Sequence, residues 1–189
     1  MAGKKEKFQL IRQMLRQIRF YMIPMASGRK KYIMKHHVFE ACGNDLFWQP
    51  RKLPSDPKCI RLHNNVAVAA DVTFINHDVI YLVINRMGKG PCKENIRATE
   101  VMDNVFIGLG ATIMPGVRIG PNAIVAARSV VTKDVPEGSV VAGSPARVIG
   151  TFDDVVKKQL AGGQYDGDGR FDPDTLQQVW EKFEEQHSL

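Results

Sequence analysis

His77 is the histidine best placed for chemistry in this 189-residue chain, because it stands in the segment FINHD, where a regular six-residue pattern breaks off. Histidine titrates closer to neutral pH than any other side chain, so it accepts and returns a proton readily. An isolated histidine is more typical of a surface or a packed interior. We interpret the other four histidines in that structural sense: His36, His37, His63 and His187.

Three acidic residues are candidates for holding the second ring nitrogen of His77. Asp78 is adjacent, and in an extended segment it would project to the opposite side. Glu94 and Glu100 lie within and at the end of the interruption that follows, where the chain can return toward His77. Each is equally well explained as a solvated acid, so the residues alone leave the choice open.

A six-residue repeat must position these side chains. From Val101 the chain runs through six blocks that each open with Val or Ile: VMDNVF, IGLGAT, IMPGVR, IGPNAI, VAARSV and VTKDVP. The fifth residue of each block is small or β-branched and precedes the next aliphatic residue by two, which is the side-chain period of a strand. The pattern predicts an all-β core, a parallel coil with three short strands and about eighteen residues per turn, and an interior made of first and fifth positions.

The same frame occurs earlier, at Leu62, Val68 and Phe74, and is lost in residues 80–100. A long irregular insertion within a compact repeat is typical of a functional segment. We therefore predict a β-coil domain over residues 59–150 with the loop 80–100 inserted.

Helical regions are expected on both sides of the coil. Residues 1–58 form an N-terminal helical and irregular region, in which residues 5–23 have the apolar spacing of an amphipathic helix. Residues 151–189 form a C-terminal helical extension with helices predicted over 152–161 and 173–187.

Basic residues are concentrated at the N-terminal end. The net charge is +6, and residues 1–58 carry 13 Lys/Arg against 4 Asp/Glu, whereas residues 151–189 carry 4 against 9. Such asymmetry is seen at nucleic-acid or membrane surfaces, but also where a basic face binds an anionic substrate or packs against an acidic tail. We expect no nucleic-acid partner, and we favour packing of helix 5–23 on the coil over contact with a membrane surface.

Cysteines and acids predict neither disulfides nor a metal. The three cysteines are odd in number and far apart, which fits a reducing cytoplasm, and no export signal is recognised at the N-terminus. The acidic segment 166–172 departs from a calcium loop, because Arg170 stands in place of a carboxylate and Phe171 in place of a glycine. We expect a turn there.

The segment from Ile107 to Gly150 resembles the hexapeptide-repeat acyltransferases, which have a left-handed parallel β-helix. Its end, VTKDVP followed by VVAGSPARVI, is similar to the branch containing maltose and galactoside O-acetyltransferases, serine acetyltransferase and xenobiotic acetyltransferases. The resemblance implies acetyl transfer from acetyl-CoA, without a metal, in a cytoplasmic homotrimer whose active sites lie between neighbouring coils.

The resemblance also implies roles for particular residues. His77 takes the place of the family's catalytic histidine as general base, and the pair His77–Asp78 is similar to family variants, which makes Asp78 the preferred partner. For CoA, the resemblance implies contacts with the backbone at Leu109 and Ala127. It also implies contacts with Thr132 and Lys133 of VTKD and with Arg147 of SPAR. Leucine at 109 and glycine at 150 depart from some relatives.

We therefore predict an acetyl-CoA-dependent O-acetyltransferase acting on a hydroxyl of a sugar or glycan precursor. A xenobiotic or amino-sugar N-acetyltransferase of the same fold is the first alternative, and a non-catalytic β-helix scaffold is another. A zinc enzyme of this fold would need three converging histidines, whereas only His63 and His77 lie in the repeat.

Overall fold

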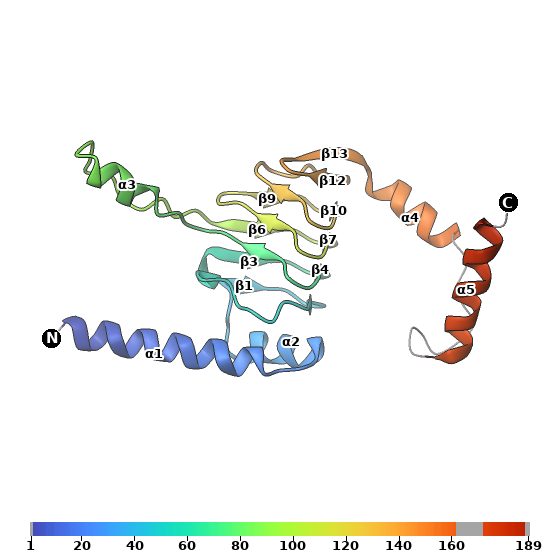
Figure 1. Ribbon diagram of the computed structural model, residues 1–189, viewed down its shortest axis with the longest axis horizontal. Helices are drawn as coiled ribbons and strands as arrows, with labels where there is room; N and C mark the ends of the chain where they lie inside the picture. The colour runs from blue at the N-terminus through green and yellow to red at the C-terminus, as the bar shows by residue number, and fades with distance from the viewer. Residues whose placement is uncertain (1, 162–171, 188–189) are drawn as a thin grey trace. The chain divides into compact units, whose positions relative to one another are not determined.

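The computed structural model describes residues 2–161 and 172–187 (Figure 1). The chain divides into two compact units, Met1–Phe152 and Asp153–Leu189. Most of the acidic segment expected to form a turn, residues 166–171, lies outside the described residues.

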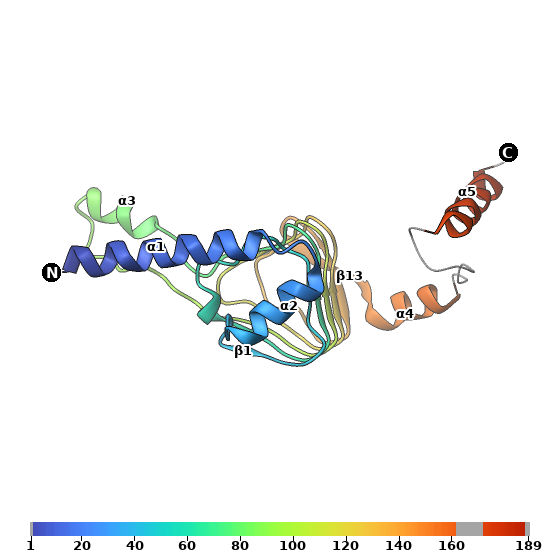
Figure 2. The same ribbon diagram turned by 90° about the horizontal axis from the view of Figure 1, so that it is seen from below.

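Thirteen short strands form three sheets in the first unit, with spatial orders β1-β3-β6-β9, β13-β12-β10-β7-β4-β2 and β11-β8-β5. The strands are β1 (Ala41–Cys42), β2 (Phe47–Trp48), β3 (Ile60–Leu62), β4 (Val66–Val68), β5 (Thr73–Phe74), β6 (Thr99–Val101), β7 (Val105–Ile107), β8 (Thr112–Ile113), β9 (Arg118–Ile119), β10 (Ala123–Val125), β11 (Val130–Val131), β12 (Ser139–Gly143) and β13 (Ala146–Thr151). All pairs are parallel except β12 with β13. From β1 to β12, consecutive strands fall in different sheets, so the chain winds as a three-sided coil, seen from below in Figure 2.

The pairing confirms a turn of eighteen residues. Val101 pairs with Ile119, Ile107 with Val125, and Ile113 with Val131. Each first position therefore lies directly over the first position three blocks later.

The interior of the coil is the predicted one. All six first positions from Val101 to Val131 are at most 1% exposed, and five of the six fifth positions are hydrophobic residues that are at most 4% exposed. The remaining fifth position, Ser129, is also buried, and its hydroxyl accepts a hydrogen bond from the backbone N–H of Gly143. A buried hydroxyl with a partner avoids the cost of an unpaired polar group.

Asparagines turn one corner of the coil on successive turns. Asn65, Asn104 and Asn122 have φ values of 52°, 58° and 51°, in the left-handed region that Asn tolerates better than most residues. The side-chain amide of Asn65 donates to Asn104, and that of Asn104 donates to Asn122, both at 2.9 Å. The corner is thus held by a ladder of side-chain hydrogen bonds as well as by the backbone.

The insertion leaves the coil and returns to it in register. Leu62 pairs with Val101, an offset of 39 residues, which is one turn of 18 plus the 21 residues of segment 80–100. The insertion was expected to be irregular, but residues Ile80–Arg86 form helix α3, which projects from the coil (Figure 1). The last two residues of the insertion, Thr99 and Glu100, already belong to β6.

Helices precede the coil in the first unit. Helix α1 spans Ala2–Tyr21, close to the predicted 5–23, and α2 (Ala26–Lys35) was not predicted. Phe20 of α1 and Ile33 of α2 are fully buried in the hydrophobic core. Strands β1 and β2, within the region 1–58, extend two of the sheets toward these helices.

Most of the apolar stripe of α1 is exposed in the single chain, which differs from the expected packing on the coil. Four stripe residues of α1 and one directly after the helix are between 48% and 72% exposed: Phe8, Ile11, Leu15, Ile18 and Met22. Phe20, near the end of α1, is buried in the core. No helix among the described residues is both long and apolar enough to cross a membrane.

The second unit contains helices α4 (Phe152–Ala161, whose first residue belongs to the first unit) and α5 (Pro173–His187), as predicted. Asp172 accepts hydrogen bonds from the backbone N–H and hydroxyl of Thr175, at 2.9 and 2.8 Å, and so caps the first turn of α5. These bonds lower the pKa of Asp172.

Replacing Ile113 by alanine should lower the free energy of unfolding by about 2–5 kcal/mol, because a buried aliphatic side chain is lost from a stacked interior. Ile149→Ala, on the exposed strand β13, is the matched control and should change stability by less than about 0.5 kcal/mol. Urea denaturation at one protein concentration measures both. Equal losses would contradict the assignment of first positions as the core.

Candidate active site

His77 meets an aspartate that the sequence did not point to. Its ring nitrogen Nδ1 contacts Oδ2 of Asp56, which precedes the 3₁₀ turn Pro57–Cys59. Its other nitrogen, Nε2, lies 4.0 Å from Oε1 of Glu94. All three side chains are about one third exposed, so a solvent-borne reactant can approach them.

The returning arm of the insertion holds the His77 segment in place. Asn76 is buried, and its amide donates to the carbonyl of Arg97 at 3.0 Å and to the hydroxyl of Thr99 at 3.1 Å. The backbone N–H of Arg97 donates to the carbonyl of Asn76 at 2.8 Å, and His77 bridges antiparallel to Ile96. The position of His77 therefore depends on the returning end of the insertion.

The contact with Asp56 assigns the proton of a neutral imidazole. An ionised carboxylate only accepts hydrogen bonds, so the His77 nitrogen that faces Asp56, Nδ1, carries the proton. Nε2 then has a free lone pair, and no described residue lies within hydrogen-bonding distance of it. This arrangement can take a proton from an incoming hydroxyl or amine.

Asp78 lies close in sequence but contacts other groups. Its Oδ1 accepts from the backbone N–H of Ile80 at 2.9 Å, and its Oδ2 lies 3.5 Å from the amide nitrogen of Asn95. The carboxylate thus stabilises the start of α3 and the insertion. Of the three acids considered from the sequence, only Glu94 is near the His77 ring.

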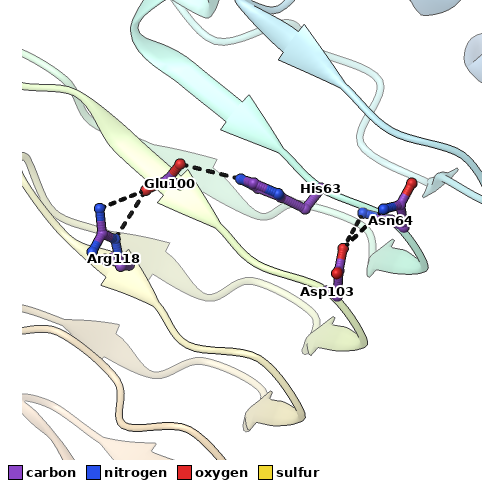
Figure 3. Close-up of polar contacts among 5 residues, drawn as sticks. All are labelled: His63, Asn64, Glu100, Asp103 and Arg118. Carbon is purple, nitrogen blue, oxygen red and sulfur yellow. Dashed lines mark hydrogen bonds and ion pairs between the residues drawn. The ribbon is translucent and has the colours of Figure 1, made fainter.

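Glu100 belongs to a separate cluster on the outer face of the sheet β1-β3-β6-β9 (Figure 3). Its Oε1 lies 3.1 Å from Nε2 of His63, and its Oε2 accepts from Nε and Nη2 of Arg118 at 2.9 and 2.8 Å. The hydrogen bond with His63 and those with Arg118 lower the pKa of Glu100, although partial burial opposes them. Glu100 therefore links neighbouring turns of the coil rather than orienting His77.

Asp103 makes a second link between turns beside this cluster. Its Oδ1 accepts from the backbone N–H of Asn64 at 2.7 Å and from its amide at 3.1 Å (Figure 3). Within residues 2–161 and 172–187 no group of three His, Cys, Asp or Glu side chains could hold a metal ion.

The residues expected to bind CoA fall into two groups. Lys133 and Arg147 line one cavity of about 240 Å³ between the last turn and β13. Thr132, which precedes Lys133 in the sequence, is exposed. Leu109 and Ala127 are exposed at one corner on successive turns, where the backbone N–H of Arg128 donates to the carbonyl of Leu109 at 2.8 Å. A Cβ on Gly108 would lie 2.5 Å from the nitrogen of Ala127, so this corner requires glycine.

This geometry defines a class of protein: a three-sided parallel β coil of hexapeptide repeats with a histidine–aspartate pair beside an insertion. Residues 98–133 match the family described as bacterial transferase hexapeptide (six repeats). The chain thus carries the hexapeptide repeat, and the resemblance to hexapeptide-repeat acetyltransferases is confirmed.

Solved structures with the same fold include two sugar acetyltransferases. A maltose O-acetyltransferase from Clostridium difficile 630 is 22% identical, with a TM-score of 0.55 over 76% of this chain and 88% of that one. A galactoside acetyltransferase in complex with coenzyme A is 23% identical, with a TM-score of 0.57 over 85% of this chain and 86% of that one. At these identities the likeness establishes the fold.

A curated relative catalyses a different transfer. The 2,3,4,5-tetrahydropyridine-2,6-dicarboxylate N-acetyltransferase of Staphylococcus aureus is 52% identical over 62 residues, which is 32% of this chain and 26% of that protein. The chain therefore spans about a quarter of the length of the curated relatives it matches.

Replacing Glu100 by glutamine should destabilise the protein at pH 7 and much less at pH 3. A carboxyl whose pKa is lowered by folding adds stability above its unfolded pKa, and this stability is lost as the pH falls through the folded value. Urea denaturation of both proteins from pH 7 to pH 3 measures the difference. Glu137→Gln, at an exposed position on the coil, is the control and should show no such trend. A loss of stability by Glu100→Gln that does not depend on pH would contradict the ionic role of Glu100.

Proposed function

We propose that this protein is an acetyl-CoA-dependent acetyltransferase with His77 as its general base. The observation that carries the proposal is the pairing of His77 Nδ1 with Asp56, which leaves Nε2 free beside the insertion of a hexapeptide-repeat coil. The known structures of this fold that bind coenzyme A or are named acetyltransferases support it.

The reaction follows from the free lone pair of His77. Nε2 removes the proton of the acceptor hydroxyl while the oxygen attacks the thioester carbonyl, and the negatively charged tetrahedral intermediate then expels the CoA thiolate. The imidazolium returns the proton to the thiolate sulfur, so the products are the acetyl ester and CoA. Asp56 stabilises the imidazolium and fixes the ring orientation.

The cavity between Lys133 and Arg147 would hold the phosphates of CoA. Two cations and one acid, Asp134, line this cavity, so its net positive charge attracts phosphate. Arginine also binds phosphate with two parallel hydrogen bonds. The pantetheine arm would then follow the exposed corner of Leu109 and Ala127. This assignment uses the residues predicted from the sequence.

The acceptor that we favour is a hydroxyl of a sugar or glycan precursor. We further propose that the coil is left-handed and that the protein assembles as a cytoplasmic homotrimer with active sites between subunits. The fold shared with maltose and galactoside acetyltransferases supports the sugar. N-acetyl transfer is the second candidate, because the Staphylococcus aureus relative is an N-acetyltransferase. The same histidine would serve it by removing a proton from the attacking amine.

Replacing His77 by alanine should lower the rate of acetyl transfer by at least about a hundredfold, since proton transfer by a positioned base contributes that much or more. Thiol release from acetyl-CoA against a panel of sugars and amines measures the rate and identifies the acceptor atom. Calorimetry should find unchanged binding of CoA to the variant. A variant with the same rate as the natural protein would overturn the role of His77.

Asp56→Asn separates a positioning role from a purely structural one in the same experiment. The amide can present a nitrogen toward the ring and cannot stabilise an imidazolium, so kcat should fall and its dependence on pH should change. An unchanged pH profile would assign Asp56 to the fold alone.

Lys133→Ala and Arg147→Ala should each weaken CoA binding by about three- to tenfold, which corresponds to about 0.7–1.4 kcal/mol. Binding of acetyl-pantetheine, which lacks the nucleotide phosphates, should not change, because the lost charges face phosphate. Lys31→Ala, at an exposed position on α2, is the control of equal charge. Equal losses for both ligands would contradict phosphate binding at this cavity.

A further inference from the structure

A second and larger cavity lies in the first unit, at the N-terminal end of the coil. Its volume is about 670 Å³, within the range typical of small-molecule sites. The lining combines cations with polar and aromatic side chains from the helices, the loop after β2 and a corner of the coil, and its members include Tyr21, Arg29, Gln49, Arg51, Lys52 and Asp71. None of these residues has a part in the chemistry proposed above.

Among the described residues, Arg29 is a buried cation without an acidic partner. The residue is 5% exposed, and its Nε donates to the carbonyl of Trp48 at 3.2 Å. Its Nη1 donates to the carbonyls of Ile23 and Pro24 at 2.7 and 3.2 Å, whereas Nη2 donates to no described residue. A buried charge held only by neutral carbonyls is costly, and a bound anion would compensate it.

Two further cations line the same cavity. Arg51 and Lys52 are exposed and form no ion pair with any described acid, and the guanidinium of Arg51 lies 5.7 Å from the ring centre of Tyr21. Burial, and then the nearby charge of Arg51, lower the pKa of Arg29. Against these three positive charges the lining includes one acid, Asp71, so the cavity has an excess of two positive charges.

Gln49 adds a neutral donor to this lining. Its Oε1 accepts from the backbone N–H of Ala70 at 3.1 Å, which fixes the amide, and its nitrogen donates to no residue in the described part of the chain. The guanidinium, ammonium and amide donors that line this cavity suit the several acceptor oxygens of a phosphate.

Two segments that line the cavity lead along the chain to His77 and to its partner Asp56. Lys52 is four residues from Asp56, and Thr73, also in the lining, is four residues from His77. Four extended residues span at most about 14 Å. A substrate bound by a phosphate in the cavity could therefore present a hydroxyl near the His77 ring.

We propose that this cavity binds the phosphate group of the acceptor, which makes the substrate class a phosphorylated sugar. The identification of the bound molecule as an acceptor rests on the function proposed above, whereas phosphate binding itself does not. A neutral sugar would lack the group that compensates Arg29.

The test uses the full-length protein and the double variant Arg51→Ala/Lys52→Ala. Arg29 is left intact because its three carbonyl contacts support the fold. Lys31→Ala/Lys35→Ala removes the same charge from exposed positions of α2 and serves as the matched control. Calorimetry with inorganic phosphate, a hexose 1-phosphate and the unphosphorylated hexose measures binding, and thiol release from acetyl-CoA measures transfer.

We expect the natural protein and the control to bind both phosphates but not the hexose, and the double variant to lose at least tenfold in affinity. The KM for the phosphorylated acceptor should rise with kcat unchanged, and CoA binding should not change. Absence of phosphate binding, equal losses in the control, or a matching loss of CoA affinity would each overturn the proposal. Phosphate binding without transfer to any acceptor would refute the proposed activity and leave the anion site intact.

Discussion

Parallel hydrogen bonding between successive turns is the constraint on which the rest of this structure depends. Each strand is only two to six residues long, so no strand is stable alone, and each gains its partners from the turns above and below. Such pairing stacks each strand residue on its equivalent in the next turn, and in the repeat from Val101 eighteen residues per turn place Ile119 over Val101. The aliphatic columns inside and the asparagine ladder at the corner both follow from this spacing.

The periodic part of the fold could be predicted from sequence because it repeats. Within the blocks from Val101, each inward position is specified several times over by residues of the same kind, so chance deviations such as Ser129 do not hide the frame. Helix α2 has no such redundancy. Of its ten residues only Arg29 and Ile33 are buried, and a charged residue at a buried position obscures the apolar spacing that identifies a helix.

Asp56 shows the limit of sequence reasoning at the site. It lies 21 residues before His77, so the two meet across turns of the coil and not along a strand. The repeat frame begins to be readable only at Leu62, and therefore gave no reason to place Asp56 beside the ring. Asp78 was the nearest acid in sequence, yet its carboxylate, two residues before α3, accepts from the backbone N–H of Ile80 and not from the ring of the neighbouring His77. The position of Glu100 on a strand likewise commits it to cross-strand partners.

The insertion leaves and rejoins the coil without disturbing the pairing of Leu62 with Val101. In terms of chain entropy, its two ends are fixed by the coil whatever lies between them, and doubling the length of such a loop costs only about 0.6 kcal/mol. Segments of different length and composition can therefore be exchanged at this point while the scaffold stays folded. Because Arg97 holds Asn76, next to the proposed base His77, each exchange would alter the surroundings of the His77 ring. The coil can thus keep its stability while the segment beside His77 changes.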